Sequence, residues 1–152
     1  QQRVLEAAPV LIYQRLAGVL AYEPRLQQAS IEELHALRIA FKRLRYTVEF
    51  FREVLGPQAS GVLKAIKAMQ DHLGDLNDAD VACALLSRFL AEWDARQKDL
   101  PLPQRHNPQP LVAYLAVQHA ERHRLMTAFP QAWENFFSPQ FKRSLALAIA
   151  EL

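Results

Sequence analysis

The chain has 152 residues, enough for one domain with a buried core, and 51% of them are hydrophobic. This apolar content and the presence of only four glycines exclude a disordered chain, and a single cysteine, Cys83, excludes an internal disulfide framework. The formal net charge of +2 conceals two blocks of opposite sign. Residues 35–67 contain seven Lys/Arg and two acids, net +5, whereas residues 71–94 contain six acids and one Arg, net −5. We expect the two blocks to lie near each other in the fold.

The first predicted helix covers the apolar run from Val4 to Tyr22 and stops before Pro24. Polar residues and a proline interrupt this run at Glu6, Pro9, Gln14 and Arg15. The run is therefore expected to be neither a signal peptide nor a membrane span.

The second predicted helix covers residues 31–55 as one long rod. Ser30 and Glu33 fit a capping box at its start, and Gly56 followed by Pro57 marks its end. Apolar residues at spacings of three and four form a seam for burial against other helices: Leu37, Phe41, Leu44, Val48, Phe51 and Leu55.

Basic residues of the same helix project within an arc of roughly 100°: His35, Arg38, Lys42, Arg45 and Arg52. Glu49, four residues after Arg45, can neutralise only part of them. A row of cations on a rigid rod suits a polyanion with repeated charge, because arginine offers two parallel donors to phosphate oxygens. A solvated helix face with some salt bridges accounts equally well for the pattern.

The next apolar seam predicts a third helix, and Gly74 is expected to break or turn it: Val62, Ile66, Met69, Leu73 and Leu76. Asp78 is then expected to cap the following helix. Asp71, Asp75 and Asp78 can instead position the arginines of the second helix. Asp71 also has the alternative of pairing with Lys67, and His72 is expected to be half-buried and hydrogen-bonded.

Four of the nine prolines fall between Asp99 and Pro110, which predicts an exposed loop. A helix is expected over residues 111–128, and Pro130 should start or kink the segment that follows. Ser138 and Pro139 fit the start of a last helix. Because no alternating β pattern occurs, the predicted fold is all-α: an antiparallel bundle of about five to six helices, forming one domain over residues 1–152.

No catalytic constellation is evident. His119 and His123 share a helix face, but no third metal ligand stands near them in the sequence. Asp71-His72 reverses the His-Asp order of helical metal-dependent phosphohydrolases, and there is no Gly-rich phosphate loop. We therefore expect no enzyme activity, no metal and no cofactor.

Two motifs together resemble one family: HALRIAFKRLRYTVEFF, followed about twenty residues later by MQDHLGDLNDADV. They are similar to the conserved-histidine α-helical domain, or CHAD domain, whose members are associated with inorganic polyphosphate binding. The resemblance covers at least Leu34 to Leu86. It matches the family's histidine to His35 and its basic positions to Arg38, Lys42, Arg43 and Arg45. It matches the LGxxND element to Leu73, Gly74, Asn77 and Asp78.

The resemblance implies an architecture of two related helical halves around a basic groove, of which this chain looks like the C-terminal half. A second CHAD half or a homodimer would complete that groove. The implied ligand is polyphosphate or a similar polyanion, with nucleic acid bound only non-specifically, no membrane partner, and a cytoplasmic location that includes polyphosphate granules. The expected binding residues are His35, Arg38, Lys42, Arg43, Arg45, Arg52, Lys64 and Lys67, supported by Asp71, Asn77 and Asp78.

Overall fold

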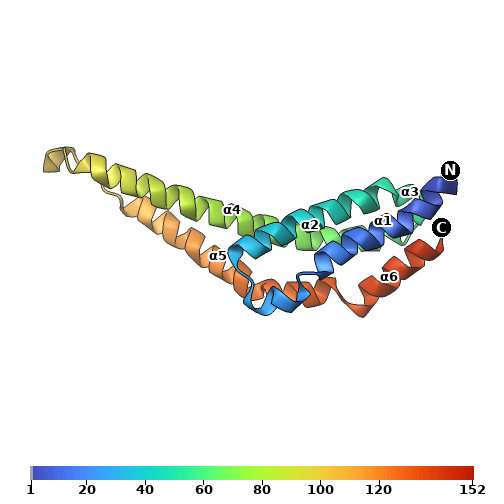
Figure 1. Cartoon of the computed structure of the whole chain (residues 1–152). Helices are drawn as coiled ribbons and strands as arrows, with labels where there is room; N and C mark the ends of the chain where they lie inside the picture. The colour runs from blue at the N-terminus through green and yellow to red at the C-terminus, as the bar shows by residue number, and fades with distance from the viewer. Residues whose placement is uncertain (1) are drawn as a thin grey trace. The chain divides into compact units, whose positions relative to one another are not determined.

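The computed structural model describes residues 2–152, and all regular structure in that range is helical (Figure 1). The predicted all-α fold is confirmed. Two short 3₁₀ turns lie at Glu23–Gln28 and Leu102–Gln104. The α-helices in chain order are α1 (Gln2–Leu20), α2 (Ile31–Phe50), α3 (Arg52–Leu55), α4 (Ala59–Gln97), α5 (Gln109–Phe136) and α6 (Pro139–Ala150).

The chain groups into two compact units, which are described separately. The core unit comprises residues up to Gly74 together with Phe129–Leu152, and the hairpin unit comprises Asp75–Ala128. Helices α4 and α5 each contribute to both units. The single domain expected over the whole chain stays a prediction.

In the core unit, α1 lies beside α2 (Figure 1). Helix α1 buries one stripe, Ala8, Ile12, Leu16 and Val19, because these residues recur at helical spacing. By length and composition, Gln2–Gln28 is apolar enough to cross a membrane, a test that core helices of soluble proteins and signal sequences also pass. The expectation that this run is neither a signal peptide nor a membrane span therefore stays a prediction.

Helix α2 begins where the capping box predicts. The Ser30 hydroxyl oxygen accepts a hydrogen bond from the backbone N–H of Glu33 at 3.1 Å. The predicted seam is confirmed, since all six of its residues are buried. The predicted single rod is interrupted at Phe51 (φ −95°, ψ 8°), where Val54 and Leu55 both donate to the Phe51 carbonyl at 3.1 Å. This tighter turn separates α3 from α2, and Gly56 at φ 74° ends α3.

An aromatic cluster joins α2 to the end of α5 and to α6. The Phe41 ring packs edge-on against Trp133 and Phe136, with centroid distances of 6.2 and 4.8 Å. Phe136 also contacts Phe141 of α6 at 4.6 Å. Offset and edge-to-face aromatic pairs are favourable beyond the area that they bury. The cluster therefore fixes α2 firmly within the core unit.

Helix α4 runs without interruption through Gly74, so the predicted break there is wrong, and so is the predicted helix cap at Asp78. A glycine inside a helix costs only about 1 kcal/mol relative to alanine. The apolar seam on either side outweighs this cost, because Leu73 and Leu76 are both buried. Asp78 is consequently an exposed residue within the helix.

Helix α5 also continues through Pro130, which therefore does not start a new segment. Pro130 is exposed, while its neighbours Phe129 and Trp133 are buried and hold this part of the helix in the core. The predicted start of the last helix is confirmed. The Ser138 hydroxyl oxygen accepts from the Phe141 N–H at 3.1 Å, with Pro139 in the first turn of α6.

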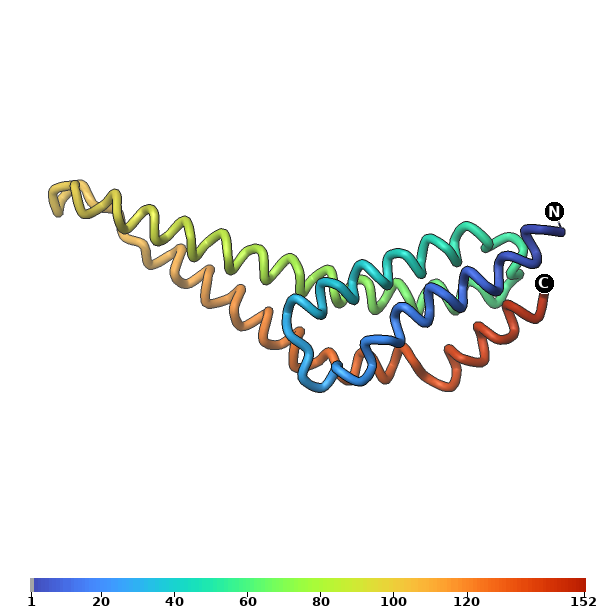
Figure 2. The backbone as a smooth tube through the Cα atoms, in the orientation of Figure 1, coloured from blue at the N-terminus to red at the C-terminus, as the bar shows by residue number. Residues whose placement is uncertain are grey.

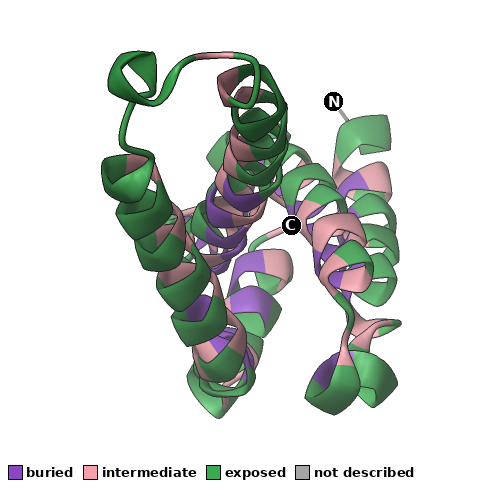
Figure 3. Cartoon of the chain, turned by 90° about the vertical axis from the view of Figure 1, so that its left-hand side faces the viewer, coloured by how far each residue is buried: buried purple, intermediate pink, exposed green. Residues whose placement is uncertain are grey.

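The hairpin unit consists of antiparallel stretches of α4 and α5 joined by a Pro-rich connection, which Figure 2 shows as a tube. An ion pair between Arg122 Nε and Asp80 Oδ1 at 3.3 Å links the two helices. Few of its residues are buried (Figure 3), and residues 101–110 are all exposed. Cys83 is one of the buried ones, as expected for a small apolar side chain.

Candidate functional site

The basic row is defined here as His35, Arg38, Lys42 and Arg45, all on α2. His35, Arg38 and Arg45 are half-buried, and Lys42 is exposed. Because α2 is a regular helix over this range, the spacing of these residues places them within an arc of roughly 100°. The row and the buried seam share one rigid element, so burial of the seam fixes the direction of the row.

Arg45 is held by two neighbours. Its Nε donates to Glu49 Oε1 at 3.0 Å, and its Nη1 donates to Gln70 Oε1 of α4 at 3.1 Å. The Arg45 side chain retains 31% of its exposure. The prediction that Glu49 neutralises only part of the row is therefore confirmed, and Gln70 is a positioning residue that the sequence reasoning missed because it sought carboxylates.

Arg38 and Lys42 are less constrained. Within residues 2–152, neither side chain forms an ion pair with an acid. The Lys42 ammonium lies 5.9 Å from the centroid of the Tyr46 ring, within the range of a cation–π contact. These two cations are separated by four residues, one helical turn, and remain available to an external anion.

Asp71, the expected supporting carboxylate of the core unit, forms no ion pair with the row. Asp71 is exposed and forms no ion pair within the described part of the chain, and the polar contact from α4 comes from Gln70 instead. Asn77 and Asp78 belong to the hairpin unit, outside the unit that carries the row. Their supporting role stays a prediction.

The remaining expected cations are distributed around the core unit. Arg43 lies about 100° around α2 from Lys42 and faces the α1 side. Arg52 belongs to α3, after the interruption at Phe51. Lys67 shares a face of α4 with Gln70, three residues later. Lys64 lines a separate shallow groove of about 360 Å³ beside Ser138 and Ser144. The row thus lies on one regular helix, whereas Arg52 belongs to α3, Lys64 belongs to α4, and Arg43 lies on another face of α2.

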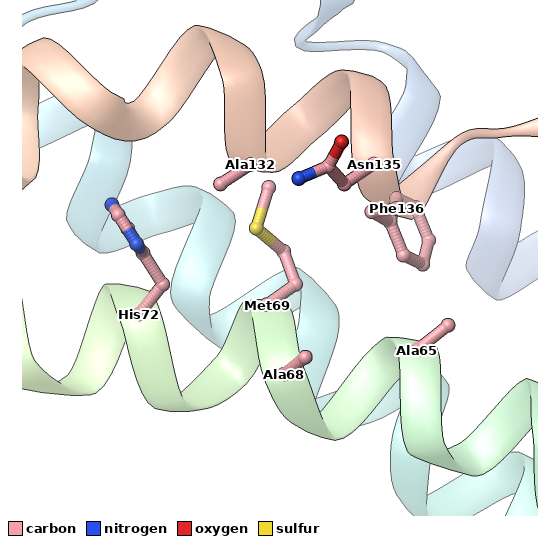
Figure 4. Close-up of a pocket in the computed structure, with 7 residues that line it drawn as sticks. All are labelled: Ala65, Ala68, Met69, His72, Ala132, Asn135 and Phe136. Carbon is pink, nitrogen blue, oxygen red and sulfur yellow. The ribbon is translucent and has the colours of Figure 1, made fainter.

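His72 lines a small cavity of about 180 Å³ between the first part of α4 and the end of α5 (Figure 4). The other lining side chains are mostly apolar and include Met69, Ala132 and Phe136, with Asn135 as a polar neighbour. The His72 ring centroid lies 6.0 Å from that of Phe129. His72 is half-buried, as predicted, and its surroundings favour a structural role in the core.

Within residues 2–152, no three His, Cys, Asp or Glu side chains lie close enough together to hold a metal ion.

One ion pair of the hairpin unit shifts the pKa values of both of its partners. Hydrogen bonds from Arg124 to both carboxylate oxygens of Glu121, at 2.6 and 2.9 Å, lower the pKa of Glu121. The same contact raises the pKa of Arg124. Glu121 and Arg124 are three residues apart on α5, so this pair is a local surface contact.

Comparison with known proteins places these features in a family. A family model described as the CHAD domain matches residues 1–87, a range that contains α1, α2, α3 and the whole basic row. No curated protein and no solved structure matches the chain. Because the family model covers more than half of the sequence, the chain belongs to the CHAD domain family.

Proposed function

We propose that this chain binds inorganic polyphosphate along the basic row of α2. The observation that carries the proposal is the placement of Arg38 and Lys42 on one helix face, with no acidic partner within residues 2–152. Membership of the CHAD family, which is associated with polyphosphate, supports the same ligand. Arg38 and Lys42 would make the main contacts, and His35 and Arg45 would extend the track.

The spacing of the row suits an extended anion. Arg38 and Lys42 are one turn apart, about 5.4 Å along the helix axis, so one chain of linked phosphates can contact both. Arg45 is already oriented by Glu49 and Gln70, so it loses little side-chain freedom when a phosphate binds. The contact with Glu49 also weakens phosphate binding, because the Glu49 carboxylate repels an incoming anion.

A single row gives modest affinity. If the four groups of the row each contribute about 1 kcal/mol, the total is roughly 4 kcal/mol, which corresponds to about millimolar binding. Two rows acting on the same polymer gain through effective concentration. We therefore propose that tight binding requires a second CHAD half or a second copy of this chain.

The proposal is tested by titrating short and long polyphosphate into the full chain at two salt concentrations. Affinity should rise with polymer length and fall with salt, because bound phosphates release counterions. The double variant Arg38→Gln/Lys42→Gln should bind about tenfold more weakly or worse. Arg96→Gln/Lys98→Gln in the hairpin unit removes the same charge and should bind nearly as wild type. Affinity indifferent to polymer length and to salt would contradict the proposal.

Non-specific nucleic-acid binding is the second candidate, because Tyr46 is 56% exposed beside Lys42. An aromatic ring next to a cation can stack on a base. A single ring can stack on only one base of a single-stranded nucleic acid, so we rank polyphosphate first. Competition at equal phosphate concentration separates the two ligands, and displacement of polyphosphate by RNA would reverse the ranking.

We further propose that the chain binds its ligand without hydrolysing it, and that it acts in the cytoplasm. The reversed Asp71-His72 order and the absence of a Gly-rich phosphate loop from the sequence support the first point. The unpaired thiol of Cys83, buried in the hairpin unit, is compatible with a reducing compartment. Metal-stimulated release of phosphate from polyphosphate by the purified chain would contradict the first point.

A further inference from the structure

The hairpin unit leaves most of its apolar surface uncovered (Figure 3). Between Ala84 and Arg124 no residue is buried, although both helices carry large apolar side chains over this range. Two helices that pack side by side cover only one stripe of each other. Apolar side chains outside that stripe need a further surface to cover them.

Four large side chains of the hairpin unit remain about half exposed and form what is called here the hairpin face. Leu85 and Phe89 are four residues apart on α4, and Tyr114 and Val117 are three residues apart on α5, so each pair lies on one side of its helix. Each of these side chains retains between 52% and 60% of its exposure. An exposed apolar cluster of this kind marks an interaction site more often than isolated exposed residues do.

The ion pair between Asp80 and Arg122 sets the register of the two antiparallel helices. Each step forward along α4 is therefore matched by a step back along α5. Leu85 lies five residues after Asp80. Val117 lies five residues before Arg122, so Leu85 and Val117 are at the same level of the hairpin.

The other two members of the hairpin face lie one turn further along. Phe89 and Trp93 of α4 line a shallow hollow of about 180 Å³ together with Leu111 of α5. The centroids of the Phe89 and Trp93 rings are 6.0 Å apart. Tyr114 follows Leu111 by three residues and so lies on the adjacent part of α5. The hairpin face is therefore continuous across both helices.

The size of the hairpin face suits a protein partner. About twenty residues of α4 extend about 30 Å, and two adjacent helices are about 20 Å wide, so the face covers about 600 Å². Two such faces in contact bury about 1,200 Å² in total, the lower end of the range for specific protein–protein interfaces. We expect a contact of this size to be reversible and of micromolar affinity, which leaves the dilute chain monomeric.

The charges of the two helices favour a second copy of the same chain as the partner. Residues 75–97 of α4 contain five acids and two Arg, net −3, whereas residues 109–128 of α5 contain one acid and two Arg, net +1. Placing α4 of one copy over α5 of another brings opposite net charges together, whereas α4 over α4 brings like charges together. The hairpin face is thus complementary to itself, as a twofold interface requires.

We propose that two copies of this chain associate through the hairpin face, with α4 of each copy packed against α5 of the other. The product is an intermolecular four-helix bundle that covers the four exposed side chains. The interface lies in the hairpin unit, outside the unit that carries the basic row, so association does not depend on polyphosphate. A dimer also brings two basic rows into one particle, which increases affinity for a long polymer.

The test is sedimentation velocity of the full chain without any polyanion, across the micromolar range of protein concentration. The wild-type chain should show a reversible equilibrium between monomer and dimer. Leu85→Glu and Val117→Lys should each weaken dimerisation at least about tenfold, because each places a charge in the apolar contact. Val10→Glu is the matched change in the core unit, at an exposed position of α1, and should leave dimerisation unchanged.

A mixture of the two hairpin variants tests the pairing of α4 with α5. In a mixed dimer, the carboxylate introduced by Leu85→Glu meets the ammonium introduced by Val117→Lys. The second contact between α4 and α5 keeps its wild-type side chains. Mixed dimers should therefore form more tightly than dimers of either variant alone. Failure of the mixture to associate would overturn this pairing.

Thermal unfolding of the variants separates loss of the interface from loss of the fold. Leu85 and Val117 are half exposed, so both variants should unfold close to the wild-type temperature. A wild-type chain that stays monomeric throughout the micromolar range would overturn the proposal. Dimerisation that survives Leu85→Glu, or that is lost in Val10→Glu instead, would also overturn it.

The variants of the basic row distinguish this interface from the proposed function. Arg38→Gln/Lys42→Gln should dimerise as wild type does, because both residues belong to the core unit. If the chain dimerises but does not bind polyphosphate, the proposed function fails and the interface stands. If the chain binds polyphosphate but stays monomeric, the interface fails and the proposed function stands.

Discussion

The core unit and the hairpin unit use similar helices but bury very different amounts of side chain. The seam of α2 is almost completely inaccessible, with Leu37 and Phe41 at 0% exposure. In the hairpin unit, Leu85 and Phe89 of α4 retain 56% and 52% of their exposure. The basic row belongs to the well-buried unit. A binding surface gains from this placement, because a rigid scaffold holds its cations in position before the ligand arrives.

The largest expected effect comes from removing a ring from the core unit. Phe41→Ala should lower the free energy of unfolding by about 3–5 kcal/mol, because it leaves a cavity under Trp133 and Phe136. Phe89→Ala, the matched change in the hairpin unit, should cost less than about 1 kcal/mol because the ring is half exposed. Chemical denaturation of both variants measures the difference. Equal losses would show that the contrast in burial does not extend to stability.

Two glycines of the core unit differ in their backbone roles, because Gly56 ends α3 and Gly74 lies inside α4. Gly56 has φ 74°, so Gly56→Ala should destabilise the chain by about 1–3 kcal/mol. Gly74 lies within α4 with nothing within 4 Å of an added Cβ, so Gly74→Ala should stabilise it by about 0.5–1 kcal/mol. Thermal unfolding of the two variants measures whether each substitution raises or lowers stability. Destabilisation by Gly74→Ala would argue against a continuous α4.

Removal of a carboxylate should act differently in the two units. Glu49→Gln releases Arg45 and removes a repulsive charge from the basic row, so polyphosphate affinity should rise by about twofold to fivefold. Asp94→Asn in the hairpin unit removes the same charge beside Lys98 and should change affinity little. Titration with long polyphosphate compares the two variants. An equal gain in both would mean that only the net charge matters.

The smallest expected effect concerns pH and the hairpin unit. The hydrogen bond from Arg124 lowers the pKa of Glu121, so the folded chain holds this carboxylate ionised more firmly than the unfolded chain does. The resulting stabilisation is present at neutral pH and is lost as pH falls through the lowered pKa. Urea unfolding should therefore show a small difference between wild type and Glu121→Gln at pH 7 that disappears in acid. A difference that grows in acid would contradict this sign.

The sequence pattern predicted the burial of both seams because helical periodicity reports the buried face directly. The caps at Ser30 and Ser138 were also predictable, since each depends on a local hydrogen bond within one turn. The local signal was misleading at Gly74, where tertiary packing of neighbouring apolar residues keeps α4 continuous. At Pro130 no new helix starts, and the alternative of a kink stays a prediction. A glycine or proline marks a break only when the flanking residues do not hold the helix in place.

The parts of the candidate site that depend on contacts between helices could not be predicted from the sequence. The arc of the basic row follows from spacing on one helix, and the structure groups its members accordingly. The contact between Arg45 and Gln70 joins residues 25 apart in sequence, so it depends on how α2 meets α4. Periodicity within one helix does not specify how two helices cross.

The most direct test of the central claim is an NMR titration of the isotope-labelled full chain with long-chain polyphosphate. The account predicts that the largest amide shifts and the strongest broadening fall in residues 35–45 of α2, with smaller changes near Gln70. It also predicts little change around the exposed basic residues Lys98 and Arg105 of the hairpin unit. Changes concentrated on those hairpin residues, or spread evenly over all exposed cations, would contradict it.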